Sequence, residues 1–385
     1  MAGTSLGQRT WAARAVSVLV VGASAAGLVA HLWRLSDDRS RIDLHIYFAA
    51  VKQAFPGHLY DFKFLPTGLG FAYPPFAALV LKPITALSFA AVDHGWLLAT
   101  AAASVAFVAL GLRELPTTPV LPGYRTALVA ACVWAAPIYL TARIGQINAF
   151  LALAVLVDFV AARRDRPWAG VLTGLAAALK LTPAIAVLAM VACGFRRAAG
   201  RAVGAAAAVT ALAFAVAWHD SWRYWTGAVF DIRRVGTLSN GFSNSLRRML
   251  TLTHLPSILQ AGVWAGLTIA LLVVAFLRAR RAGEHGNPLA ALVIVICCGF
   301  AIAPITWSHH LYFFVLVLPL VIGDGRQPMR LAAAVGIALL LFEWHNPGQN
   351  TTLTAVRGVV IPLVVLALPI DRMTKPAAHV QPAQS

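Results

Sequence analysis

The chain reads RRDRPWAGVLTGLAAALKLTPAIAVLAMVACGFRRAAGR from Arg163 to Arg201, and this stretch constrains the fold most strongly. Arginine clusters flank its apolar centre, residues 167–195, and such clusters in short loops favour the cytoplasmic side of a membrane. The centre must therefore cross the membrane an even number of times. Two full spans need about 40 residues, which is more than the centre contains. We therefore predict a re-entrant hairpin whose turn runs from Lys180 to Pro183.

A lysine at the tip of such a hairpin indicates a functional site. Non-helical backbone at membrane depth is tolerated only beside protein or a water-filled cavity, and an ionisable side chain there marks a functional site. The alternative is one long helix whose Lys180 extends its ammonium towards the membrane surface. That alternative would break the arginine pattern, so the hairpin is favoured.

The composition of all 385 residues agrees with a membrane protein. Hydrophobic residues make up 59% and charged residues 12%, and the mean hydropathy is +0.75. These values exclude an ordinary cytoplasmic enzyme, a disordered protein and a disulfide-stapled domain. The four cysteines lie in apolar runs without the spacing of metal ligands, so we expect buried thiols.

The positions of the charged residues predict which segments lie on which side of the membrane. Lys and Arg number 31 against 14 Asp and Glu, which is a net charge of +17. The basic residues lie between apolar runs and the sequence has no nucleic-acid-binding module, so we expect no nucleic-acid partner. The clusters place the amino terminus inside and the longer polar segments, residues 34–75 and 219–256, outside.

The apolar runs predict an all-α integral membrane protein. A helix needs about 20 residues to cross the hydrocarbon, and an uncleaved first helix is favoured over a signal peptide. Residues 1–370 then form one polytopic membrane domain, and residues 371–385 form a disordered cytoplasmic tail. Ten runs approach the required length: 12–33, 94–112, 124–140, 146–162, 202–218, 259–279, 288–304, 309–323, 331–344 and 352–370.

The first outer loop carries a helical pattern of its own. Apolar residues recur at helical spacing from Leu44 to Phe55 with polar residues opposite, which predicts an amphipathic helix lying on the outer membrane surface. Residues 76–91 predict a second interfacial or re-entrant piece. We therefore expect interfacial helices between the first two spans.

Asp43, at the start of this helix, is the candidate catalytic residue. At the junction of loop and interfacial helix, its carboxylate would meet the head of an amphiphilic substrate. Asp at a helix start is equally a favoured N-cap, and the sequence alone leaves both roles open.

Other polar residues gather in the outer segments. Many arginines and lysines lie there, which an anionic ligand such as a lipid phosphate or ordinary anionic headgroups would explain. His309 and His310 form a poor metal chelate, because adjacent helical residues point about 100° apart. A role beside a leaving phosphate suits them better, and two histidines without a role remain the alternative.

Side-chain amides complete the candidate site. Gln146 and Asn148 begin a helix, and Asn244 precedes Arg247 in the second outer loop. Amides can donate to and accept from sugar hydroxyls, although caps and turns use the same residues.

Taken in order, these motifs resemble glycosyltransferase family 87. The resemblance covers about residues 40 to 320 and rests on DLHIY from Asp43, YPPFAALVLKP from Tyr73, GQINAFLALAVL from Gly145, KLTPAI from Lys180, NSLRR from Asn244 and ITWSHH from Ile305. The ordered set is much more specific than any one motif. The family members that the chain resembles are the polyprenol-phosphate-mannose-dependent α-1,2-mannosyltransferases of mycobacteria and relatives.

The resemblance implies a GT-C type polytopic helical fold in the plasma membrane, with its active site on the extracytoplasmic side. It implies transfer of mannose from polyprenyl phosphate mannose to a glycolipid acceptor, with inversion. Asp43 is then the general base, and Lys180, His309 and His310 lie near the donor phosphate. The remaining expected substrate-binding residues are Tyr73, Gln146, Asn148, Asn244 and Arg247.

Elementary chemistry agrees with that mechanism. A carboxylate that removes a proton from a sugar hydroxyl contributes about 10² to 10⁴ in rate, and the anionic leaving phosphate needs cations rather than a proton. A single essential carboxylate fits inversion. The outer loops lack a carboxylate cluster for a hard divalent ion, so we expect neither a metal nor another cofactor.

Two questions stay open at this point. The acceptor is expected to be a phosphatidylinositol mannoside, with α-1,2 branching of lipomannan or lipoarabinomannan as the alternative. A lipid or solute transporter would also have broken helices and an intramembrane lysine, but the sequence shows no second copy of the KLTP break that an inverted repeat would carry. The sequence does not indicate the oligomeric state.

Overall fold

A computed structural model describes residues 3–35, 40–65, 67–117, 123–238, 240–343 and 348–372. Helices make up nearly all regular structure in these ranges, and the one pairing of extended backbone is an isolated bridge between Phe64 and Leu69. The expected all-α fold is therefore confirmed.

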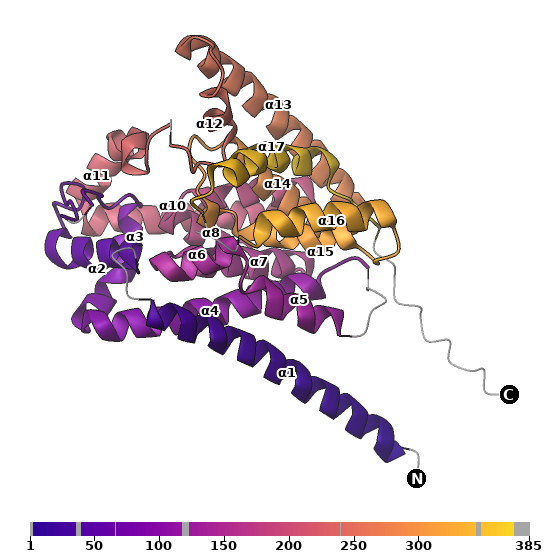
Figure 1. Cartoon of the computed structure of the whole chain (residues 1–385). Helices are drawn as coiled ribbons and strands as arrows, with labels where there is room; N and C mark the ends of the chain where they lie inside the picture. Colours follow the sequence, from indigo (N-terminus) through magenta and orange to yellow (C-terminus); the bar gives the residue numbers. More distant parts are fainter. Residues whose placement is uncertain are drawn as a thin grey trace.

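The helices pack into one elongated bundle (Figure 1). The α-helices are α1 (Gly3–Arg34), α2 (Ile42–Ala54), α3 (Pro75–Leu81), α4 (Phe89–Arg113), α5 (Tyr124–Cys132), α6 (Ala136–Ile144), α7 (Asn148–Arg163), α8 (Val171–Leu179), α9 (Ala186–Ala192), α10 (Arg196–Val216), α11 (Trp218–Thr226), α12 (Leu246–Leu250), α13 (Ser257–Glu284), α14 (Pro288–Ile302), α15 (Val317–Ile322), α16 (Pro328–Leu341) and α17 (Thr351–Ala367). Short 3-10 helices are η1 (Lys82–Ala86), η2 (Thr182–Ile185), η3 (Ala228–Phe230), η4 (Ile232–Arg234), η5 (Ser308–His310) and η6 (Tyr312–Leu316).

Four described helices are long and apolar enough to cross a membrane: α1 from Trp11, α4, α10 and α13. Helices α5 and α6, bent by 42° at their junction, would make a fifth span. Pro137 lies there and cannot donate the hydrogen bond that would continue the helix. Helices α7, α14, α16 and α17 have 16, 15, 14 and 17 residues. Of the ten candidate runs, several therefore form helices shorter than a full span, because the apolar runs end in breaks.

Residues 167–195 follow the path of a hairpin. Helix α8 ends at Leu179, Lys180 is extended with φ −153° and ψ 127°, and the chain returns through η2 and α9. The two ends of the segment lie side by side, since Arg201 in α10 donates to the carbonyl of Ala169 at 3.3 Å. Lys180 therefore lies at the tip.

Helix α14 forms the centre of the bundle. All its residues from Pro288 to Cys298 are buried, and a helix that is apolar on every side packs inside a protein. It contacts α9, α13 and α17. The expected free thiols are confirmed, with Cys132, Cys297 and Cys298 buried and Cys193 partly buried.

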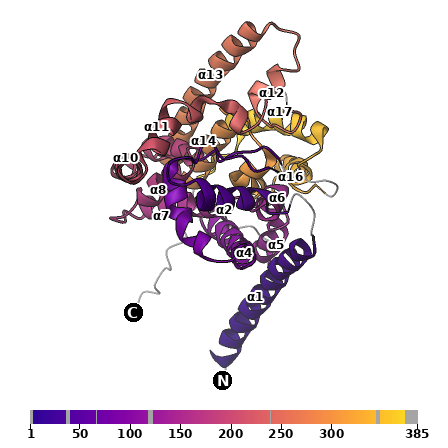
Figure 2. The ribbon, with the colours of Figure 1, turned by 90° about the vertical axis from the view of Figure 1, so that its left-hand side faces the viewer.

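The amphipathic helix of the first outer loop is present as α2. Its apolar residues Leu44, Phe48 and Val51 are buried in the main core, whereas Lys52 and Gln53 are exposed. The expectation that this apolar face lies on lipid is wrong, because α3, η1 and α4 cover it. Figure 2 looks onto this end of the molecule, where α2 lies between α4 and α6.

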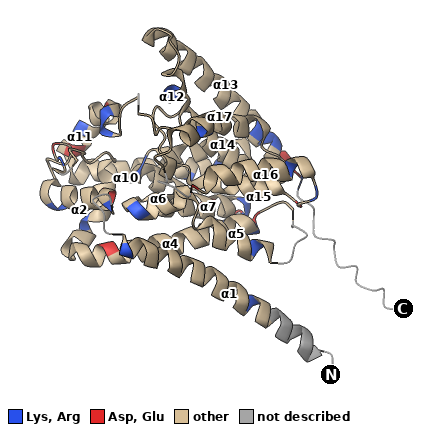
Figure 3. Ribbon diagram, in the orientation of Figure 1, with Lys and Arg blue, Asp and Glu red and all other residues tan. Residues whose placement is uncertain are grey.

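Charged residues lie at two ends of the bundle, which are told apart by the helices that they carry (Figure 3). At one end, which we call the arginine end, Glu114 pairs with Arg163 and Arg164 at 2.7 and 2.9 Å. The opposite end carries α2, α11 and α12, and we call it the α2 end. The tail expected from Asp371 begins at the arginine end, where Asp371 pairs with Arg330 at 2.7 Å. Residues 373–385 of that tail lie outside the described residues.

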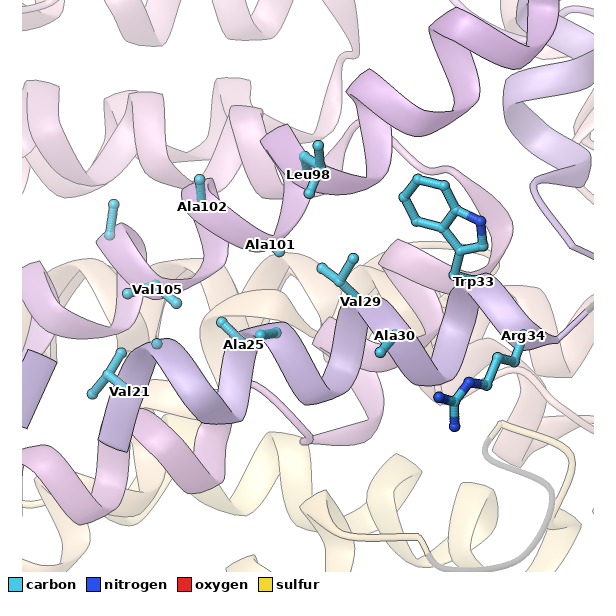
Figure 4. A pocket seen from close by; sticks show the side chains of 13 residues that line it. Val21, Ala25, Val29, Ala30, Trp33, Arg34, Leu98, Ala101, Ala102 and Val105 are labelled. Carbon is cyan, nitrogen blue, oxygen red and sulfur yellow. The ribbon is translucent and has the colours of Figure 1, made fainter. Parts of the chain in front are cut away.

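An open apolar groove of about 840 Å³ runs between α1 and α4 on the outside of the bundle. In Figure 4, Ala25 and Val29 of α1 face Ala101 and Val105 of α4, and Trp33 lies at one end of the groove. Small side chains leave this space between the helices. In a membrane, lipid chains would fill it.

Candidate active site

Asp43 is the second residue of α2 and does not cap it. Arg41, just before the helix, has a left-handed backbone with φ 56°, and no side chain caps this end. Instead, Asp43 Oδ2 accepts a hydrogen bond of 2.8 Å from Gln146 Nε2. The alternative of an N-cap role is therefore wrong for Asp43.

The turn between α6 and α7 positions the start of α2. Gly145 ends α6 with φ 74°, a conformation that glycine adopts without steric cost. A Cβ on Gly145 would lie 2.6 Å from the Cβ of Leu44. Only glycine therefore lets α2 approach closely enough for Asp43 to meet Gln146.

Gln146 is buried and links Asp43 to two tyrosines. Its Oε1 accepts a hydrogen bond of 2.8 Å from the Tyr73 hydroxyl, which is 2.7 Å from the Tyr47 hydroxyl. With Nε2 donating to a carboxylate and Oε1 accepting, the orientation of the amide is determined. The bond network therefore leaves Asp43 hydrogen-bonded on one oxygen.

Lys180 points from the hairpin tip into the same network. Its ammonium lies 2.8 Å from Asn148 Oδ1, 3.3 Å from the Tyr73 hydroxyl and 3.4 Å from Gln146 Oε1. Three acceptors match the three N–H donors of an ammonium, so this buried lysine can keep its charge. We call Asp43, Tyr73, Gln146, Asn148 and Lys180 the Asp43 cluster.

The loop with His309 and His310 lies on the other side of Lys180. The carbonyl of His309 accepts hydrogen bonds from Asn148 Nδ2 at 2.8 Å and from Thr141 Oγ1 at 3.3 Å. The two imidazole rings meet edge to face, with centroids 4.5 Å apart. Asn148 therefore holds both the lysine and the histidine loop.

Both imidazoles are neutral in this environment. Burial lowers the pKa of His309 and of His310 well below the usual range, and the charge of Lys180 lowers both further. His310 Nδ1 accepts a hydrogen bond from the backbone N–H of Trp307 at 3.4 Å, so the ring proton lies on Nε2. The pair can donate N–H bonds to an anion without carrying a positive charge.

Two predicted binding residues lie apart from the Asp43 cluster. Asn244 is fully buried, and its Nδ2 donates to the carbonyl of Thr306 at 2.9 Å. Arg247 in α12 has its guanidinium 5.8 Å from the centre of the Trp264 ring. Asn244 therefore positions the histidine loop, and within the described ranges no hydrogen bond or ion pair joins either residue to the cluster.

The environment of Asp43 favours proton transfer. Burial raises the pKa of Asp43 to about 6, while the hydrogen bond from Gln146 and the charge of Lys180 lower it. The side chain keeps partial exposure, and Oδ1 accepts no hydrogen bond from the described residues. A carboxylate with a free oxygen and a pKa near neutrality can remove a proton from a substrate hydroxyl.

Neighbouring carboxylates are engaged in structure. Asp220 is fully buried and accepts hydrogen bonds of 2.6 and 3.0 Å from the backbone N–H groups of Gly57 and Leu59. Asp61 pairs with Arg223 on the surface. Across the described ranges, no three His, Cys, Asp or Glu side chains gather as ligands for a metal. Asp43, by contrast, interacts with the charge of the buried Lys180.

The sequence of this bundle matches a known family. Residues 71–319 fit the model described as glycosyltransferase family 87. The chain belongs to glycosyltransferase family 87. Tyr73, Gln146, Asn148, Lys180 and the histidine loop lie inside the matched range. Membership makes the chain a glycosyltransferase and sets aside the transporter alternative.

Curated relatives match a larger share of the chain than the family model does. The chain is 31% identical over 345 residues to a Mycobacterium tuberculosis (strain ATCC 25618 / H37Rv) protein named polyprenol-phosphate-mannose-dependent alpha-(1-2)-phosphatidylinositol mannoside mannosyltransferase, covering 83% of this chain and 79% of the relative. It is 32% identical over 323 residues to a Mycolicibacterium smegmatis protein named polyprenol-phosphate-mannose-dependent alpha-(1-2)-phosphatidylinositol pentamannoside mannosyltransferase, covering 79% and 73%. No solved structure gives a significant match.

Some residues of this family site were not predicted from the sequence. Tyr47 lies one helical turn after Asp43, and that spacing places both on one helix face. Arg357 in α17 is buried, donates to Ser308 Oγ at 3.0 Å and pairs with Glu343. Tyr47 had a local signal in its spacing, whereas nothing near Arg357 in the sequence indicates its distant partner Ser308.

Proposed function

We propose that this family 87 glycosyltransferase moves mannose from polyprenyl phosphate mannose to a phosphatidylinositol mannoside, forming an α-1,2 linkage with inversion. The donor, acceptor and linkage are those in the names of its relatives. The observation that carries the proposal is the Asp43 cluster, in which a carboxylate with a free oxygen lies beside a buried ammonium. We place the reaction at the extracytoplasmic face of the plasma membrane.

Asp43 acts as the general base. A sugar hydroxyl is a weak nucleophile, and a positioned carboxylate takes its proton as the new bond to the anomeric carbon forms. Oδ2 is held by Gln146, so Oδ1 is the oxygen that accepts the proton. Attack on the face opposite the leaving phosphate inverts the anomeric centre, which needs no second carboxylate as nucleophile.

The donor phosphate binds beside Lys180. The leaving polyprenyl phosphate carries negative charge, and a preorganised cation stabilises it as the bond breaks. The N–H groups of Lys180 are engaged by protein acceptors, so the lysine acts through its charge. His309 and His310 supply N–H donors to the same phosphate.

Polar side chains around this centre bind the sugars. Tyr73, Gln146 and Asn148 present a hydroxyl and two amides beside the base and the cation. Asn244 and Arg247 come from the second outer loop. Asn244 acts by positioning the histidine loop, and Arg247 contributes from its place beside Trp264 of α13. No metal takes part in this mechanism.

Transfer of radiolabelled mannose tests the proposal. Purified full-length protein is given polyprenyl phosphate mannose and a phosphatidylinositol mannoside, with lipomannan as a competing acceptor, and the product linkage is determined. Asp43→Asn should reduce transfer by about 10² to 10⁴. Asp61→Asn, the same change in an exposed carboxylate, should retain transfer. Equal transfer by wild type and Asp43→Asn, or transfer to lipomannan alone, would overturn the assignment.

A further inference from the structure

A pair of cations, Lys63 and Arg234, lies at the α2 end, apart from the Asp43 cluster. Arg234, at the end of η4, donates from Nη2 to the carbonyl of Tyr60 at 3.0 Å and lies 5.6 Å from the centre of the Tyr60 ring. Its Nε and Nη1 atoms are buried and have no hydrogen-bond partner in the described chain. Buried N–H groups are nearly always paired, so the two groups at Nε and Nη1 are exceptions that a ligand could satisfy.

The carboxylate next to Arg234 does not supply that acceptor. Asp231 Oδ1 accepts a hydrogen bond of 2.8 Å from Arg233 Nε, whereas Asp231 Oδ2 is 4.0 Å from Arg234 Nε. A distance of 4.0 Å is too long for a hydrogen bond. Nη1 of Arg234 is therefore left without an acceptor among the described residues.

Lys63 approaches the same place from the neighbouring loop. A Cβ on Gly70 would lie 3.7 Å from Arg234 Nη1 and 3.8 Å from Lys63 Nζ. The same Cβ would lie 2.9 Å from the carbonyl oxygen of Phe62, so the position requires glycine. Two cations therefore converge beside a residue that has no side chain.

Exposed apolar residues lie close to this pair in the sequence. Leu65, two residues after Lys63, is 93% exposed, and Phe230, in the 3-10 helix before η4, is 78% exposed. Large apolar side chains exposed next to cations match a phospholipid, whose phosphate adjoins hydrocarbon. The chemistry of the site is therefore that of a lipid phosphate.

We infer that Lys63 and Arg234 bind the phosphodiester of the acceptor glycolipid, an assignment that rests on the function proposed above. The donor phosphate is bonded to the carbon under attack and must lie beside Asp43. Tyr60 and Tyr73 separate the cation pair from that position, since the Tyr60 hydroxyl donates to the carbonyl of Tyr73 at 2.7 Å. The phosphate of the acceptor is separated from its reacting hydroxyl by sugars. Arginine and lysine together are the usual partners of such a group.

Kinetics of two charge-matched variants test the inference. Lys63→Gln/Arg234→Gln removes the pair, and Lys52→Gln/Arg34→Gln removes one lysine and one arginine that are exposed near the same end. We expect the first variant to raise KM for the phosphatidylinositol mannoside at least tenfold, with kcat and the donor KM within twofold of wild type. The control should match wild type. An unchanged acceptor KM, or a raised donor KM instead, would overturn the inference.

Acceptors with and without phosphate give a second arm. With an alkyl mannoside that lacks the phosphodiester, Lys63→Gln/Arg234→Gln should match wild type, and a loss of activity there would show general damage and overturn the assignment. Without donor, binding of dihexanoyl phosphatidylinositol should weaken at least tenfold in this variant. Inorganic phosphate should compete poorly for the site, and equal competition would identify a free-phosphate site instead.

Failure of the inference and failure of the proposed function give different results. Mannose transfer by wild type with an unchanged acceptor KM in the variant overturns only the phosphodiester site. Absence of transfer by wild type overturns the proposed function and the acceptor assignment. The binding measurement then still decides whether these two cations hold a phospholipid phosphate.

Discussion

Asp43 and Lys180 contact opposite ends of one side-chain amide, that of Gln146. Nε2 of Gln146 donates to Asp43 Oδ2 at 2.8 Å, and Oε1 lies 3.4 Å from Lys180 Nζ. A buried amide thereby fixes the separation of the proposed base and the proposed cation. The three side chains come from different segments, so a small shift of any one segment should change the rate of mannose transfer.

The pH dependence of transfer should report the ionisation of Asp43. Burial raises the pKa of Asp43 to about 6, and a general base must be deprotonated to act. We expect kcat/KM to rise with pH through an apparent pKa of about 6. Measurement from pH 4.5 to 8 checks this, and a profile that stays flat through pH 6 would contradict the role of Asp43.

Replacement of Gln146 should move that profile. Gln146→Leu removes the hydrogen bond that lowers the pKa of Asp43, so the apparent pKa should increase. Hydrogen bonds to charged groups are worth about 1.5–3 kcal/mol, which corresponds to a shift of about 1–2 units. Gln53→Leu, the same change on the exposed side of α2, should leave the profile in place. A shift to lower pH would refute this reading of the cluster.

Two glycines offer a matched steric test. Gly145 and Gly123 have φ values of 74° and 76°, so alanine carries similar backbone strain at each. A Cβ on Gly145 would meet Leu44 Cβ at 2.6 Å, whereas nothing lies within 4 Å of a Cβ on Gly123. We expect Gly145→Ala to reduce kcat at least tenfold and Gly123→Ala to retain it. Equal activities would show that α2 is not positioned by this contact.

The buried pair of Arg357 and Glu343 should separate stability from activity. Arg357→Met leaves Glu343 charged and unpaired in the interior, which typically costs about 3–5 kcal/mol. The double variant Arg357→Met/Glu343→Gln should recover most of the thermal stability. It should still transfer slowly, because Ser308 loses the 3.0 Å hydrogen bond that holds the histidine loop. Full activity in the stable double variant would remove Arg357 from the positioning network.

Chelation tests the absence of a metal requirement. The leaving phosphate is proposed to rely on Lys180 and on the N–H groups of the histidines, so EDTA treatment of the purified protein should leave transfer unchanged. Loss of transfer with EDTA and recovery with Mg²⁺ or Mn²⁺ would contradict that proposal.

Local sequence patterns predicted most of the elements that form the site. The arginines around residues 167–195 and the break at Lys180 indicated a hairpin, and the spacing from Leu44 to Phe55 indicated α2. The surface against which α2 packs was predicted wrongly. An apolar stripe has the same periodicity whether it faces lipid or protein, so periodicity could not reveal that α3, η1 and α4 cover it.

By itself, the amino-acid sequence determined the membrane character, the helical class, the residue types of the site and the family, because hydropathy, charge spacing and ordered motifs are properties of the linear chain. Only the tertiary structure decided that Gln146 bridges Asp43 and Lys180, that the histidines are neutral, and that Arg234 keeps unpaired N–H groups. Hydrogen bonding and desolvation depend on which distant segments come into contact, and local sequence patterns do not indicate these long-range contacts.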